Sequence, residues 1–147
     1  MIYGLPGVVL PRREASDLFR IQAATEVDDA AFARIHEQVY GDGALVTALL
    51  KHPAFRCFIA WVDKEPAALG ILHINGRTAS MANGITVPTF RRRGIQLALL
   101  RHRIAVAREL GCDLIVSQAT PRNESLRNHI RAGLMIAGTK AIWGRSQ

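Results

Sequence analysis

The 147-residue sequence contains little cysteine and lysine, few aromatic residues and no long apolar run. Its two cysteines, Cys57 and Cys112, are far apart and match no metal-binding or redox spacing. The sequence therefore predicts reduced thiols in the core, no metal site and a cytoplasmic protein. No apolar stretch approaches the roughly 20 residues that span a bilayer, so we expect no membrane segment. Residues 1–10 have no basic region before their apolar part, so they make a poor signal peptide.

The net charge of +7 comes almost entirely from arginine, because lysine occurs only at Lys51, Lys64 and Lys140. A basic surface can bind nucleic acid, or it can attract a polyanionic small molecule. The arginines are scattered apart from the run at 91–93, and no aromatic-rich RNA-binding motif, zinc-finger spacing or long basic tail accompanies them. The sequence therefore favours an anionic small molecule over nucleic acid as a partner.

Hydrophobic periodicity and turn signals divide the chain into ten elements after an ambiguous N-terminal stretch at 1–17. Asn75-Gly76 is predicted as the two-residue turn of a hairpin. The most strongly patterned helix carries a stripe of Leu97, Leu100, Ile104 and Ala107 on one face. The predicted strands are 18–24, 55–62, 67–74, 78–87, 112–118 and 134–143, and the predicted helices are 25–40, 44–50, 94–110 and 123–132.

This order places an antiparallel meander before a strand–helix–strand crossover, which predicts an α+β fold with a mixed sheet. A length of 147 residues suits one domain with its own core. We interpret residues 1–17 as an N-terminal extension and residues 18–147 as the domain.

A basic, glycine-containing loop joins the third strand of the meander to the patterned helix, over 87–97. The free N–H groups of the first helical turn and the helix dipole would point at the same place there. The loop therefore predicts a binding site for an anion such as pyrophosphate.

The same loop is similar to the coenzyme A-binding motif of the GNAT superfamily of N-acetyltransferases. Pro88, Arg91 and Gly94 fall on family positions, and Gln96 replaces a small residue, where a side chain would crowd the backbone approach to phosphate. The resemblance implies a three-layer α/β/α sandwich with a GNAT-like mixed sheet over 18–147. That fold usually ends with a further strand, so the last sheet edge would be covered by residues 1–17, by a neighbouring subunit as in a homodimer, or by nothing.

A second segment resembles the second motif of this family, a helix opened by Asn and closed by Gly-Phe. Here Asn123 opens the helix, Ser125 takes its small position, and Leu134 follows Gly133 in place of Phe. Two motifs in the right order, separated by the expected helix and strand, are far more specific than either motif alone.

The resemblance also implies which residues contact acetyl-CoA. Backbone N–H groups near Ile85 and Thr86 would bind the acetyl carbonyl, at a point where this strand splays away from its parallel neighbour. Asn123, at the start of the second motif, is a further expected contact. The other cofactor-binding residues implied are Val87, Arg91, Arg92, Arg93, Gly94, Ile95, Gln96 and Leu97. We expect one of the three arginines to touch the cofactor directly.

The catalytic groups are less constrained. Many family members place a Tyr four residues before the closing Gly to protonate the leaving thiolate, and His129 occupies that position. The alternative is a histidine on the helix surface, with water as the proton donor. The strand position of a family Glu base holds Ser80, so the base would be His73, Glu37, His36 or a water chain.

The resemblance implies an acetyl-CoA-dependent N-acetyltransferase acting on a primary amine of a small molecule or peptide, bound near 32–53 and the C-terminal strand. One alternative is a GNAT-like module that binds coenzyme A or a partner chain without turnover. The other is a nucleic-acid-binding protein, a hypothesis that only the net charge supports. The sequence does not identify the acceptor.

Overall fold

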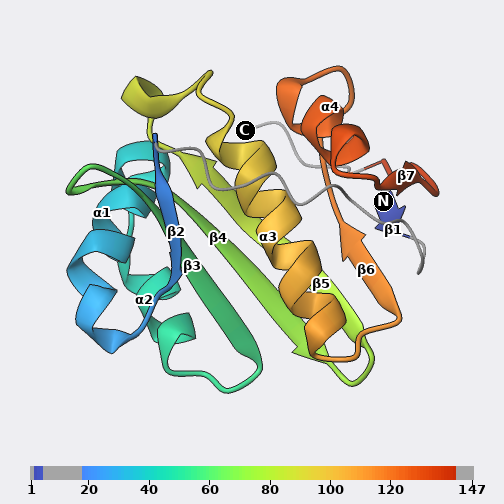
Figure 1. Cartoon of the computed structure of the whole chain (residues 1–147), viewed down its shortest axis with the longest axis horizontal. Coiled ribbons are helices and arrows are strands. Elements are labelled where there is room, and N and C mark those ends of the chain that lie inside the picture. The colour runs from blue at the N-terminus through green and yellow to red at the C-terminus, as the bar shows by residue number, and fades with distance from the viewer. Residues whose placement is uncertain (1, 5–17, 142–147) are drawn as a thin grey trace, which may run out of the picture.

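A mixed seven-stranded sheet with helices on both faces forms the centre of the computed structural model (Figure 1). The structure describes residues 2–4 and 18–141. The strand order is β2-β3-β4-β5-β6-β1-β7. The elements are β1 (Ile2–Gly4), β2 (Arg20–Ala23), α1 (Asp29–Tyr40), α2 (Ala44–Leu50), β3 (Phe55–Val62), β4 (Glu65–Asn75), β5 (Thr78–Thr86), α3 (Ile95–Glu109), β6 (Leu114–Ser117), α4 (Glu124–Arg131) and β7 (Met135–Ile136), with short 3₁₀ turns at Glu26–Asp28 and Pro88–Phe90.

The predicted α+β class and the three-layer arrangement are confirmed. Strands β2 to β5 form the antiparallel meander, and β6 then pairs with β5 in parallel after the α3 crossover. The hairpin turn lies one residue later than predicted, because Asn75 pairs with Thr78 and leaves Gly76 and Arg77 as the loop. Gly76 has a φ of +57°, and a glycine at the first loop position suits a type II′ turn, so Asn75 stays in the strand.

The C-terminal strand was predicted too long. The prediction covered 134–143, whereas β7 contains only Met135 and Ile136, and residues 137–141 are exposed and in neither helix nor strand. Without a buried face, those residues have no reason to extend the sheet. Residues 142 and 143 lie outside the described part of the chain.

The neighbour of β7 is a segment from the other end of the chain. Strand β1 pairs antiparallel with both β6 and β7, through Ile2 opposite Ser117 and Ile136 (Figure 1). Part of the 1–17 stretch therefore lies in the sheet beside β6, which is one of the three arrangements left open by the sequence. The division of the chain at residue 17 stays a prediction.

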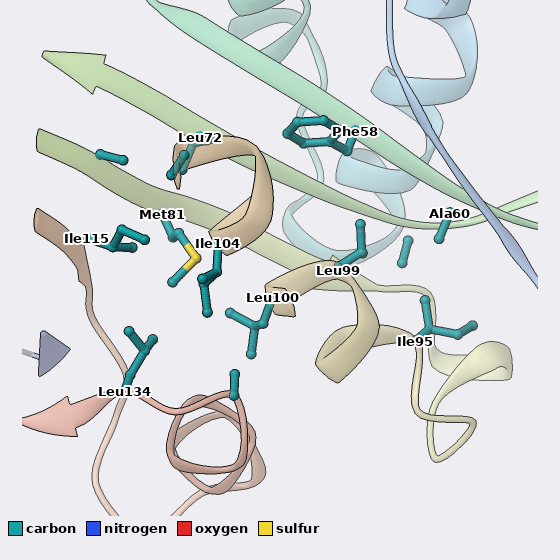
Figure 2. Packing of buried hydrophobic residues seen from close by; sticks show 14 of the residues in the cluster. Phe58, Ala60, Leu72, Met81, Ile95, Leu99, Leu100, Ile104, Ile115 and Leu134 are labelled. Atoms are coloured by element: carbon teal, nitrogen blue, oxygen red, sulfur yellow. The ribbon is translucent and has the colours of Figure 1, made fainter. Parts of the chain in front are cut away.

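The two faces of the sheet bury separate apolar clusters. Helices α1 and α2 pack on one face through Phe32, Ile35 and Val46. Figure 2 shows the other face, where Leu99, Leu100 and Ile104 of α3 pack against side chains from the sheet and against Leu134.

The predicted apolar stripe of α3 needs one correction. Leu100, Ile104 and Ala107 are buried as expected, and Leu97 is partly buried. The buried face also contains Arg103, which is only 2% exposed. The sequence pattern gave no role to this arginine.

Among the residues that the structure describes, no helix is long and apolar enough to cross a membrane.

Candidate active site

The candidate site begins where β5 and β6 stop pairing. Their parallel ladder runs from Thr78 opposite Leu114 to Met81 opposite Ser117 and ends there. Strand β5 continues to Thr86, so its last five residues have no β6 partner among the described residues. The residues of β5 beyond Met81 therefore have no parallel neighbour in the described part of the chain, as the family resemblance implies, and we call the space beside them the gap.

Thr86 supplies the main-chain groups that face this gap. The N–H of Val87 donates to the carbonyl oxygen of Ala67 in β4 at 2.9 Å. Successive N–H groups point to opposite edges of a strand, so the N–H and carbonyl of Thr86 point away from β4. Its carbonyl oxygen accepts a hydrogen bond from Nε of Arg91 at 3.3 Å, and its N–H remains directed at the gap. The N–H of Ile85 points toward β4 instead, by the same alternation.

The loop before α3 presents a row of unpaired donors. Gly94 is the N-cap with a φ of +77°, and no side chain caps the helix. The first helical N–H with an acceptor is that of Ala98, which donates to the Gly94 carbonyl oxygen at 3.1 Å. No acceptor is recorded in the described part of the chain for the N–H groups of 92–97. These donors lie at the same sheet edge as the end of β5 (Figure 1), which makes the loop suited to phosphate oxygens.

The three arginines of the loop lie in different environments. Arg91 is held by Thr86, as described above, and the guanidinium of Arg93 lies 5.3 Å from the centroid of the Phe90 ring. Arg92 has a φ of +62° and no hydrogen bond to another described residue. The pKa of the Glu124 carboxyl in α4 is lowered chiefly by its hydrogen bond with Arg127, and the charge of Arg92 contributes. Arg92 is therefore the arginine of the three with neither a recorded hydrogen bond nor a recorded ring contact to another described residue.

Gln96 lies differently from what its position in the motif predicts. A Cβ atom placed on Gly84 would be 3.1 Å from Oε1 of Gln96, so the carboxamide lies against β5 instead of projecting into the loop. The Nε2 atom of Gln96 and the Oγ1 atom of Thr86 are both buried without a hydrogen-bond partner in the described structure. Buried polar atoms are nearly always paired, so these two atoms offer hydrogen-bonding partners to a polar ligand or an ordered water.

Helix α4 borders the gap from the β6 side. Asn123 is its N-cap, and its Oδ1 atom accepts a hydrogen bond from the N–H of Leu126 at 2.9 Å. The side-chain NH₂ of Asn123 has no recorded partner among the described residues, so it remains available to a ligand carbonyl.

His129 is buried, so the alternative of a surface histidine is wrong. It is 6% exposed, with Nδ1 at 2.6 Å from the Ser125 carbonyl oxygen and Nε2 at 2.7 Å from Oγ of Ser117. A carbonyl only accepts, so Nδ1 carries the proton and the neutral Nε2 accepts from the Ser117 hydroxyl. Burial lowers the pKa of His129, the Ser125 carbonyl raises it, and the charge of Arg103 lowers it. Ser117 is the last residue of β6 that pairs with β5, so this Ser–His pair lies where the gap begins.

Comparison with known proteins identifies the family. Residues 16–133 match the Acetyltransferase (GNAT) family, which is well over half of the chain. The chain belongs to the GNAT acetyltransferase family. No curated protein sequence matches it.

Solved structures of GNAT acetyltransferases share the fold. An aminoglycoside acetyltransferase from an uncultured soil metagenomic sample is 16% identical, with a TM-score of 0.70 over 91% of this chain and 99% of that chain. The aminoglycoside N-acetyltransferase AAC(6')-Iy in complex with CoA is 16% identical, with a TM-score of 0.72 over 95% and 99%. A ribosomal-protein-alanine N-acetyltransferase from Brucella melitensis biovar Abortus 2308 is 16% identical, with a TM-score of 0.71 over 86% and 99%. At this identity the similarity supports the GNAT fold alone.

The base candidates of this GNAT chain lie apart from the gap. His73 pairs directly with Ser80 and stacks on Phe55 with ring centroids 4.7 Å apart. Ser80 precedes Thr86 by six residues of β5, which is roughly 20 Å of strand. On α1, a ring nitrogen of His36 bonds to the Asp42 carbonyl, and the side chain of Glu37 is exposed. Nothing in the structure gives any of the three a catalytic contact.

Neither Ser117, which bonds to His129, nor the buried Arg103 was predicted as a functional residue from the sequence. Ser117 ends a short apolar strand, and no sequence signal distinguishes it. Arg103 did leave a signal, because it follows Leu100 by three residues and precedes Ala107 by four, on the apolar face of α3.

The protonation state of His129 predicts how stability depends on pH. The folded state keeps His129 neutral below the ordinary histidine pKa of about 6.5, whereas the unfolded chain takes up the proton there. The unfolded state thus binds more protons, and the free energy of unfolding falls as the pH drops from about 7 to about 5. The slope is at most about 1.4 kcal/mol per pH unit for one proton. His102 adds to it, because burial also lowers the pKa of His102.

Urea denaturation at several pH values checks this expectation. His129→Gln should reduce the slope between pH 7 and 5 and leave the part due to His102. Equal slopes in the wild type and the variant would show that His129 titrates normally in the folded protein.

Proposed function

We propose that this GNAT protein transfers an acetyl group from acetyl-CoA to a primary amine of a small molecule or peptide. The observation that carries the proposal is the gap between β5 and β6, lined by the Thr86 N–H, beside the unpaired N–H groups that open α3. A long cofactor with a carbonyl at one end and phosphates further along matches these two donor sets. The two free, buried thiols, Cys57 and Cys112, support a reducing location such as the cytoplasm.

The proposed roles follow from where the donors point. The N–H groups at 92–97 and Arg92 would bind the pyrophosphate, and the Asn123 side chain would bind an amide carbonyl of the cofactor. The Thr86 N–H would stabilise the negative charge on the acetyl oxygen when the amine attacks the thioester carbon. The carbon–sulfur bond then breaks, and the sulfur leaves as a thiolate.

Ser117 and His129 would move the proton. The attacking amine loses one proton and the thiolate gains one, so a single relay can serve both steps. Because Ser117 lies opposite Met81, five residues of β5 before Thr86, ordered water would carry the amine proton to the Ser117 hydroxyl, which would pass its own proton to the neutral Nε2 of His129, and the reverse transfer would protonate the thiolate. His129 would therefore act through Ser117. Its Nδ1 proton is bonded to the Ser125 carbonyl, and its Nε2 accepts from the Ser117 hydroxyl.

Coenzyme A is expected to raise the melting temperature of the protein. Binding stabilises the folded state by RT ln(1 + [L]/Kd), which is about 2.7 kcal/mol at a hundredfold excess of ligand over Kd. Differential scanning fluorimetry with millimolar coenzyme A measures the shift, with adenosine as a control that lacks the pyrophosphate. A melting temperature unmoved by coenzyme A would refute the cofactor assignment.

Turnover is tested with [acetyl-¹⁴C]acetyl-CoA and a panel of primary amines. The panel includes an aminoglycoside and a peptide with an N-terminal alanine. Proteins of the same fold include an aminoglycoside acetyltransferase and a ribosomal-protein-alanine N-acetyltransferase. Transfer of label to any amine supports an acetyltransferase. Tight coenzyme A binding with no labelled product across the panel would favour a GNAT-like binding module instead.

A further inference from the structure

Arg103 is a buried charge without an acidic partner. Its side chain is 2% exposed, and no carboxylate of the described residues forms an ion pair with it. Burial alone lowers the pKa of Arg103 to about 10, and the group remains charged at neutral pH. Such a charge is costly unless it is hydrogen-bonded, so its contacts should show what it does.

Those contacts are main-chain carbonyls around a β-bulge in β5. Leu69 pairs with Ile85 and Ile71 pairs with Ala82, so Asn83 and Gly84 together oppose the single residue Gly70. Nη1 of Arg103 donates to the carbonyl oxygens of Ile71 and Ala82, each at 3.1 Å. These two residues face each other at the edge of the bulge. Nε donates to the Leu99 carbonyl in its own helix at 3.3 Å.

Two glycines make room for the guanidinium under the bulge. A Cβ atom on Gly70 would lie 2.9 Å from Nε of Arg103, closer than real Cβ contacts. A Cβ atom on Gly84 would lie 3.2 Å from Nη2. The bulge, the two glycines and the arginine therefore form one arrangement, in which α3 supports β5 at the residues just before Thr86.

We propose that Arg103 is a positioning residue of the acetyl-transfer site, which holds the β5 bulge so that the Thr86 N–H faces the gap. The proposal rests on the proposed function, because it concerns the donor assigned to the acetyl oxygen. A bulge adds one residue to β5 and therefore changes which main-chain groups beyond it point toward β4 and which point away. The ladder with β6 also ends at Met81, directly before the bulge.

An apolar side chain could fill this space, but it could not bind the two carbonyls. The guanidinium binds the two bulge carbonyls through Nη1 and the Leu99 carbonyl through Nε, whereas lysine would have to reach all three from a single nitrogen on a flexible stem. Arg103→Met removes the donors at similar length, and Arg103→Lys keeps the charge with one donor atom. Ile104→Ala is the matched control, because Ile104 is the next residue of α3, is 3% exposed, packs in the apolar cluster (Figure 2) and has no polar side-chain atom to bind the bulge carbonyls.

The experiment compares kcat, the Kd of coenzyme A and the amide hydrogen exchange of 82–86 in the four proteins, below their melting temperatures. For Arg103→Met we expect kcat to fall on the order of 10²-fold, as for a misplaced or lost oxyanion donor. The Kd of coenzyme A should change less than about threefold, since the phosphate donors lie in the α3 loop. Exchange at 82–86 should be faster than in the wild type. For Arg103→Lys, both kcat and the exchange rate should lie between those of the wild type and of Arg103→Met. Ile104→Ala should lower only the melting temperature.

Two results would overturn the proposal. The first is a kcat of Arg103→Met equal to that of the wild type or of Ile104→Ala, and the second is unchanged exchange at 82–86 in Arg103→Met. If the wild type transfers no acetyl group to any amine, the proposed function fails, while the exchange measurement still decides whether Arg103 holds the bulge. If Arg103→Met does not fold, the same two criteria apply to Arg103→Lys.

Discussion

Replacing Gly94 with valine is expected to weaken coenzyme A binding on the order of 100-fold while the protein still folds. Gly94 is the N-cap of α3, and its N–H lies within the run of donors at 92–97. A side chain there would stand where pyrophosphate must approach the backbone. Losing one or two charge-assisted hydrogen bonds, each worth roughly 1.5–3 kcal/mol, weakens binding on the order of 100-fold. Isothermal titration calorimetry with coenzyme A measures the change.

The structure offers a control at the other end of the same helix. Gly94 has a φ of +77° and Gly111 a φ of +78°, and a Cβ atom on either would meet nothing within 4 Å. Valine at each position therefore costs a similar left-handed strain of about 1–2 kcal/mol, without a clash. Gly111→Val should be less stable than the wild type by this amount and should bind coenzyme A with wild-type affinity. Wild-type affinity in Gly94→Val would mean that the loop only connects β5 to α3.

Local signals were sufficient to predict most of the fold. The meander, the crossover, the C-terminal end of α1 and both ends of α2 followed from periodicity and from Gly and Pro punctuation, and these features depend on neighbours in sequence. The position of Ile2–Gly4 between β6 and β7 could not be predicted, because it is a pairing between opposite ends of the chain. Such a pairing depends on the register of distant strands, which local pattern does not encode.

In the candidate site, too, the parts formed by consecutive residues could be predicted and the contacts between distant residues could not. The anion-binding loop could be predicted because its residues are consecutive, from Pro88 to Leu97. The contacts that bring in Ser117 and Arg103 link separate elements, so they required the three-dimensional structure. Gln96 shows the limit of motif comparison. Its side chain departs from the family pattern, yet it lies against Gly84 and leaves the loop open.

His129→Ala is expected to lower kcat and kcat/KM together, by roughly 10²- to 10⁴-fold, the usual range for general acid–base assistance. The affinity for coenzyme A should remain nearly unchanged, because the imidazole contacts Ser117 and Ser125 and not the phosphate loop. Steady-state kinetics with the best amine of the panel, together with calorimetry, separates the two effects.

The contact between His129 and Ser117 makes the prediction more specific. If the proton travels through both groups, Ser117→Ala should cause a similar loss, and the double variant should lose little more than either single variant, because the residues act as one unit. Ser125→Ala is the control, since His129 bonds to the Ser125 carbonyl, which alanine retains, and the Ser125 side chain is exposed. Independent, additive losses at Ser117 and His129 would argue against a relay. Wild-type turnover in His129→Ala would mean that His129 only anchors α4 to β6, and that water protonates the thiolate.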